Sequence, residues 1–205
     1  ALQQAGWPPG GFQHLILHQT STMTLNSARR AINLLLNNEI FHEGNTVNNL
    51  EQRGNTASTS HFIALADCIR NNKIQTGDRA TFGISASGLT IGTALYVFDH
   101  LPDRMRGTAS PQSSVPEDIP GKRAFPAMPG IRIETIGTIP GNNNSARNSM
   151  QSARRAAENC LSKSTYTSGD IGLLLYCGVY RTHYLLEPAY AALLAGELDI
   201  NAATP

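Results

Sequence analysis

The sequence predicts an α/β fold in which a mixed β-sheet is packed with helices, and three observations indicate it. Apolar runs of strand length alternate with segments of helical periodicity, and the order strand, helix, strand occurs in each half of the chain. Two runs, 79–85 and 90–98, are joined by a short Ser-Ala-Ser-Gly turn, which favours an antiparallel pair. A proline-rich stretch at 101–129 then separates the two halves.

In the first half, each helix is expected to follow a short apolar strand. One helical segment carries an apolar stripe at helical spacing, formed by Leu25, Ala28, Ile32, Leu35 and Leu36. The next repeats apolar residues at i, i+3, i+4 and i+7, with a Ser58 or Thr59 cap at its start. The expected elements are strands at 15–17 and 45–50, a helix at 22–37 and a second helix that ends before the turn at Gly77.

In the second half, the same alternation continues after the proline-rich stretch. A polar turn, Asn142-Asn143-Asn144, separates the first strand from a helix, and Pro188 stands at the first position of the last helix, where proline is tolerated. The expected elements are strands at 131–139 and 171–177 and helices at 146–162 and 188–195.

Composition excludes several classes of function. The chain has 16 Lys and Arg against 15 Asp and Glu, so no basic surplus favours nucleic acid. No apolar run is long enough to cross a membrane. The cysteines and histidines show no metal-ligand spacing, so neither a metal nor another cofactor is expected. The three scattered cysteines predict a reduced, cytoplasmic setting. Ala1 opens a segment that resembles the last turns of a helix, so we expect a fragment boundary there.

Two side chains are suited to stabilising a negative charge. His18 directly follows the buried strand at 15–17, and Asn55 lies in a glycine-containing loop before a helix. A histidine at a strand exit and an asparagine at a helix entrance can face one pocket and offer two N–H donors to a developing oxyanion. For each there is an ordinary alternative: His18 can cap a strand, and Asn55 can be a turn residue.

The motifs around these residues resemble a known family. His18-Gln19, then Gly54-Asn55-Thr56, then the segment 83–95 with Gly88 in its turn, are similar in order and spacing to the C-terminal portion of β-ketoacyl-acyl-carrier-protein synthase III. The resemblance covers about residues 1–98. It implies a thiolase-like fold, present here as incomplete halves.

The resemblance also implies roles for four residues. His18 and Asn55 would be catalytic, donating to the thioester oxygen of a malonyl group while its enolate forms. Gly88 and Gln19 would belong to the oxyanion and substrate-binding group, although Ala86 and Ser87 stand where the family often has further glycines. The family's nucleophilic cysteine has no counterpart at Cys68, Cys160 or Cys177, so this chain alone is expected to show little turnover.

The second half resembles the beginning of the same family. The strand at 131–139, the helix after it and the strand at 171–177 are similar to the family's opening elements. We therefore predict three parts: residues 1–100 as a C-terminal portion, 101–129 as a linker and 130–205 as an N-terminal portion. Such an order is expected of a fragment that spans a tandem junction, or of a rearranged unit.

The function expected from this resemblance is acyl transfer, a decarboxylating Claisen condensation in fatty acid or polyketide synthesis. Acyl-CoA or acyl carrier protein thioesters, the remaining synthase segments and a second copy of the chain are the expected partners. Arg29 and Arg30 are either a solvated helix face or a contact for an acidic carrier. Two alternatives stay open: a non-catalytic docking piece, and a hydrolase that uses Ser85 or Ser87 with His18. The hydrolase lacks a nucleophile elbow.

Overall fold

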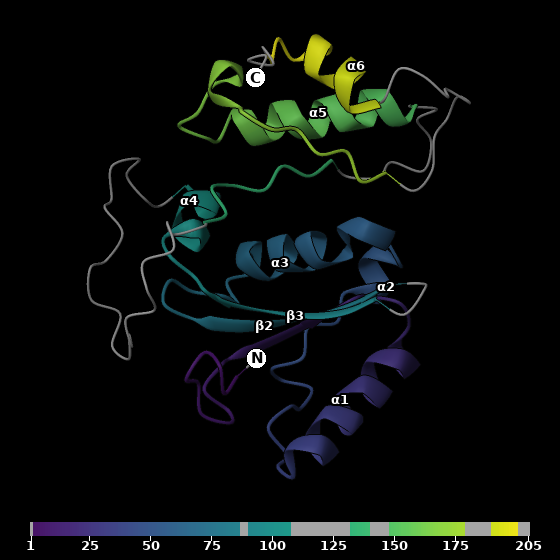
Figure 1. The fold of residues 1–205 in the computed structure, drawn as a ribbon, viewed down its shortest axis with the longest axis vertical. Coiled ribbons are helices and arrows are strands. Elements are labelled where there is room, and N and C mark those ends of the chain that lie inside the picture. The colour runs from purple at the N-terminus through teal and green to yellow at the C-terminus, as the bar shows by residue number, and fades with distance from the viewer. Residues whose placement is uncertain (1, 87–89, 108–131, 140–147, 179–189, 201–205) are drawn as a thin grey trace. The chain divides into compact units, whose positions relative to one another are not determined.

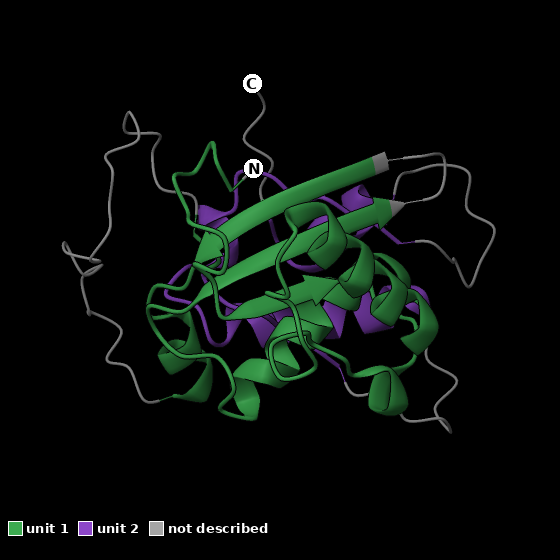
Figure 2. Cartoon of the chain, turned by 90° about the horizontal axis from the view of Figure 1, so that it is seen from below, with its two compact units in different colours: residues 1–133 green, residues 134–205 purple. Residues whose placement is uncertain are grey.

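A computed structural model describes residues 2–86, 90–107, 132–139, 148–178 and 190–200. The chain divides into two compact units, residues 1–133 and residues 134–205, which Figure 2 shows in different colours. None of the helices in the described ranges is long and apolar enough to cross a membrane.

Unit 1 is built on a three-stranded mixed sheet. Its strands are β1 (His14–Leu17), β2 (Arg79–Ala86) and β3 (Thr90–Val97), in the order β1-β2-β3. β1 runs parallel to β2 with Leu15 opposite Thr81, and β3 runs antiparallel to β2 with Ala94 opposite Phe82. The predicted α/β class and the antiparallel hairpin are confirmed. Its turn, residues 87–89, lies outside the described residues.

Two helices cover opposite faces of this sheet (Figure 1): α1 (Thr22–Leu36) and α3 (Ser60–Arg70). Because side chains alternate along a strand, β1 supplies both layers. Leu15 and Leu17 are buried in one cluster with Leu25 of α1. Ile16 is fully buried and, by the same alternation, belongs to the α3 layer.

α1 begins at Thr22, the residue at which this helix was expected to start. The Ser21 hydroxyl accepts a hydrogen bond from the Thr24 N–H, which satisfies one of the free donors of the first turn. On its flank, the guanidinium of Arg29 lies 3.6 Å from a Glu43 carboxylate oxygen, and the Arg29 side chain is only 14% exposed. Arg29 is therefore neither a fully solvated residue nor an open docking contact, while Arg30 is exposed.

The strand expected at 45–50 is wrong. A single parallel bridge joins Thr46 to Leu15, and helix α2 (Leu50–Arg53) follows. The reason is local: the Asn48 side-chain oxygen accepts the Leu50 N–H and bends the chain, a common asparagine turn. After the 3-10 turn η1 (Ala57–Thr59), Thr59 stands at the N-cap of α3, but its hydroxyl donates to the Thr56 carbonyl instead of capping the helix.

The stretch predicted as linker begins with structure. Residues 101–106 form helix α4 (Leu101–Arg106), with Leu101 and Pro102 buried. Proline is tolerated in a first helical turn because that N–H has no helical partner. The Arg106 guanidinium donates to the carbonyls of Ile69 and Ile74 and so ties α4 to the end of α3. Residues 108–131 lie outside the described residues.

Unit 2 contains helices α5 (Ser149–Leu161) and α6 (Tyr190–Glu197) and the 3-10 turn η2 (Ser168–Asp170). Asn148 caps α5 through its side chain, which accepts from the Gln151 N–H. The Ser149 hydroxyl donates to the Tyr190 hydroxyl, 3.3 Å away, and links the two helices.

The two strands expected in unit 2 are wrong for the described residues. Positions 132–139 and 171–177 form no β-ladder there. A strand needs a neighbour for its backbone hydrogen bonds and a surface for its apolar side chains. Leu173 and Leu175 are each 74% exposed, so an apolar pattern of strand type is present without a surface that buries it.

Candidate functional site

His18 lies where β1 ends against the start of α3. Its ring atom Nδ1 is 2.5 Å from the hydroxyl oxygen of Ser60, the first residue of α3, and Ser60 is only 1% exposed. The His18 backbone N–H donates to the Gly83 carbonyl of β2 at 3.3 Å. Three elements therefore fix the position of this side chain.

A second imidazole lies beside it, and the sequence analysis missed it. The rings of His18 and His61 are stacked with centroids 5.8 Å apart and planes 21° apart. His61 Nε2 is 2.9 Å from the Gly83 carbonyl, and since a carbonyl only accepts, this nitrogen carries the proton. The sequence offered one indication of His61 as a site residue: it lies in the first turn of the helix that was expected to begin after Ser58 or Thr59.

The electrostatics of this pair favour a neutral His18. Burial lowers the pKa of His18, and the positive charge that His61 can carry lowers this pKa further. A neutral imidazole can donate one N–H without protonating what it binds. No group of three His, Cys, Asp or Glu side chains that could hold a metal ion occurs in the described part of the chain.

We expect His18 to titrate below the ordinary histidine value of 6.5. The unfolded chain then binds the proton more readily than the folded one, so the contribution of His18 to stability is complete above about pH 6.5 and decreases as the pH falls through that value toward the folded pKa. An NMR pH titration of the His18 ring protons checks this. A midpoint at or above 6.5 would contradict it.

Asn55 lies in the loop that leads to α3, and its side chain is exposed. Its side-chain oxygen accepts the backbone N–H of Ala57 at 2.9 Å. Ala57 has φ 51°, in the left-handed region that a residue with a Cβ rarely adopts. The amide oxygen is thus occupied, and the amide NH₂ remains as a donor. His18 and Asn55 both flank the N-terminal end of α3, each with its own anchor and without a hydrogen bond between them.

Gln19 has a different place from the one predicted. It is fully buried, its amide NH₂ donates to the carbonyls of Leu17 and Val47, and its oxygen accepts the Asn49 N–H. All three bonds go to backbone, so the side chain ties β1 to the segment after Thr46. The structure therefore supports a structural role for Gln19 and not substrate binding.

The remaining candidates for the site are the turn at 87–89 and the three cysteines. Gly88 and Ser87 lie outside the described residues. Cys68 is buried, and burial raises the pKa of its thiol to about 11, which leaves it unreactive. Cys160 is partly buried, and Cys177 is exposed. The raised pKa of Cys68 is the opposite of the shift that an activated nucleophile needs.

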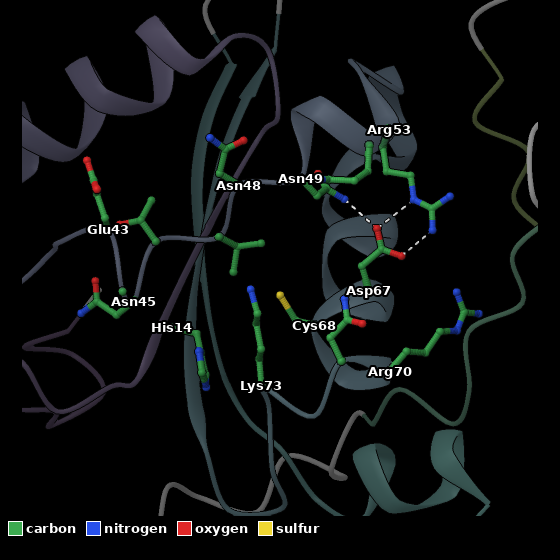
Figure 3. Close-up of a pocket in the computed structure, with 15 residues that line it drawn as sticks. His14, Glu43, Asn45, Asn48, Asn49, Arg53, Asp67, Cys68, Arg70 and Lys73 are labelled. Carbon is green, nitrogen blue, oxygen red and sulfur yellow. Dashed lines mark hydrogen bonds and ion pairs between the residues drawn. The ribbon is translucent and has the colours of Figure 1, made fainter.

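A cavity of about 810 Å³ lies elsewhere in unit 1, lined by residues from 43–53 and from the C-terminal half of α3 (Figure 3). His18 and Asn55 do not line it. On its wall, Asp67 accepts hydrogen bonds from Arg53 at 2.9 and 2.8 Å and from Asn49 at 3.0 Å. Burial alone would raise the pKa of Asp67, but these bonds outweigh burial and lower it.

Comparison with known proteins gives one consistent relationship. Residues 2–98 match the family model of the C-terminal region of 3-oxoacyl-[acyl-carrier-protein] synthase III. The chain is 33% identical over 96 residues to the chloroplastic β-ketoacyl-[acyl-carrier-protein] synthase III of Arabidopsis thaliana, covering 46% of this chain and 22% of the relative. It is 28% identical over 98 residues to synthase III 2 of Lactiplantibacillus plantarum, covering 48% and 28%.

Two solved structures of synthase III are also similar to part of this chain. The synthase III of Aquifex aeolicus is 29% identical, with 47% of this chain and 29% of that chain covered and a TM-score of 0.41. The synthase III of Pseudomonas aeruginosa is 27% identical, with 47% and 28% covered and a TM-score of 0.40. The chain thus spans less than a third of the length of the relatives it matches. Residues 2–98 are therefore similar to the C-terminal portion of the β-ketoacyl-[acyl-carrier-protein] synthase III family.

Proposed function

We propose that this chain supplies the enolate-stabilising part of an acyltransferase that condenses an acyl thioester with a malonyl thioester. One observation carries the proposal. Each group has one polar atom already engaged: His18 Nδ1 with the Ser60 hydroxyl, and the Asn55 side-chain oxygen with the Ala57 N–H. The groups left over, the imidazole Nε2 and the amide NH₂, are the ones that can donate to an oxyanion.

The chemistry needs two neutral donors. When the malonyl group loses carbon dioxide, the carbon–carbon bond breaks and its electron pair passes to the thioester as an enolate. Hydrogen bonds from His18 and Asn55 to the thioester oxygen stabilise that charge. Neither group holds a proton acidic enough to quench the carbanion, since an amide is not an acid and the lowered pKa of His18 keeps its ring neutral. The carbanion then attacks the carbonyl carbon of the acyl thioester. The new carbon–carbon bond forms, the carbon–sulfur bond of the acyl thioester breaks, and its thiolate leaves.

The acyl-accepting step requires a cysteine with a lowered pKa. Cys68, whose thiol pKa is raised by burial, does not provide one, and we propose that this nucleophile comes from further synthase segments. The same proposal includes acyl-CoA or acyl carrier protein thioesters as partners, a homo-oligomer and a cytoplasmic setting. A non-catalytic piece derived from a condensing enzyme is the second candidate, favoured by the inert environment of Cys68.

Asn55→Ala tests the proposal, because it removes the second donor without touching His18. In the protein that contains this chain, we expect the release of carbon dioxide from malonyl thioester to slow about 100-fold. Asn48→Ala is the matched control: Asn48 is also exposed, and its side-chain oxygen also accepts the backbone N–H two residues later. Equal rates for Asn55→Ala and Asn48→Ala would count against the proposed function.

A further inference from the structure

We infer that Ser60 is a positioning residue, which holds His18 in the tautomer that carries its proton on Nε2. The inference concerns which nitrogen is protonated, and it rests on the proposed function only for the use made of the donor. Nothing in the resemblance or in the comparisons assigns a role to Ser60.

The direction of the hydrogen bond follows from the protons available. The Ser60 hydroxyl has one proton, is almost completely shielded from water, and has His18 Nδ1 as its hydrogen-bond partner among the described residues. If Nδ1 carried a proton, that proton would point at the Ser60 oxygen, and the buried hydroxyl proton would be left without an acceptor. Leaving a buried donor unsatisfied is unfavourable, because burial removes the water that would otherwise accept its proton. The hydroxyl therefore donates to the lone pair of Nδ1, and the imidazole proton goes to Nε2.

Two neighbours keep the ring where Ser60 can reach it. The Gly83 carbonyl accepts both the His18 backbone N–H and the ring N–H of His61. His61, held in this way, stacks against the His18 ring and limits its rotation. In the described part of the chain, Nε2 of His18 has no hydrogen-bond partner, so the donor that Ser60 specifies remains available.

Nitrogen-15 NMR of the labelled chain tests the inference directly, since the two ring nitrogens of a neutral histidine give distinct signals. In the wild type above pH 7 we expect His18 Nδ1 to appear as the unprotonated nitrogen and Nε2 as the protonated one. Ser60→Asp places a group that only accepts next to Nδ1, so we expect the assignment to invert or the ring to become doubly protonated. Ser60→Thr keeps the hydroxyl and should keep the wild-type signals.

A wild-type spectrum with the proton on Nδ1 overturns the inference, and so does a folded Ser60→Asp variant with unchanged tautomer. If Ser60→Asp does not fold, the wild-type and Ser60→Thr spectra still decide. These spectra need no turnover. A failure of the inference is therefore separate from a failure of the proposed function, which the decarboxylation rates of the Asn55 and Asn48 variants decide.

Discussion

His18→Ala is expected to slow decarboxylation of malonyl thioester about 100-fold to 1000-fold in the protein that contains this chain. The substitution removes the donor that Ser60 orients and leaves Asn55 alone with the developing charge. The loss should appear in kcat, because the donor interacts most strongly with the enolate and less with the uncharged thioester. Carbon dioxide release, measured at saturating substrate, reports this step.

His42→Ala is the control for His18→Ala. His42 is exposed, and its ring accepts the Gly44 N–H in a surface turn. The alanine variant should keep the wild-type rate. Because His18→Ala also leaves the buried Ser60 hydroxyl without its partner, its fold should be compared with the wild type by circular dichroism. A folded His18→Ala protein with an unchanged rate would rule out the proposed role of this residue.

Leu65→Ala is expected to lower the free energy of unfolding by about 2–5 kcal/mol. Leu65 is completely buried in α3, between Ala64 and Ala66, which are also fully buried. The substitution removes apolar contacts and leaves a cavity that rigid neighbours fill only in part. Because Ser60 and His61 also belong to α3, the destabilised helix should hold the His18 ring less firmly. Urea denaturation followed by circular dichroism measures the change.

Leu35→Ala in α1 is the matched control. Leu35 was expected on the apolar stripe of this helix, but it is 85% exposed in the structure, so that expectation is wrong. Leucine and alanine have similar helix propensities, so this change should leave the unfolding free energy within about 0.5 kcal/mol of the wild type. A comparable loss in both variants would mean that burial in α3 does not dominate the stability of unit 1.

The elements that could be predicted are those whose signal is local. The β2–β3 hairpin was expected at 79–85 and 90–98, within one residue of its observed ends, because two strand-length runs flank a short turn. α1 was expected at 22–37 and ends one residue earlier. It could be predicted because apolar residues recur along it at helical spacing. The signals for both elements lie within a short stretch of the sequence.

The features that could not be predicted depend on contacts with segments distant in the sequence, which a local sequence pattern does not specify. The run containing Leu173 and Leu175 has a strand's composition, but a strand exists only where another chain segment pairs with it. Gln19 resembles a site residue because it follows His18, yet burial directs its three hydrogen bonds to backbone groups. His61 became a candidate only when its distance to the His18 ring was known.

The left-handed backbone conformation at Ala57 helps to fix the orientation of the Asn55 side chain, because the Ala57 N–H donates to the Asn55 side-chain oxygen. A methyl-bearing residue is held there in a conformation that glycine would adopt freely, at a cost on the order of 1 kcal/mol. Glycine would adopt this conformation without strain, but it would also increase the number of conformations open to the loop and to the unfolded chain. Glycine at position 57 would therefore relieve the backbone strain and would hold the Asn55 amide in a less well-defined orientation.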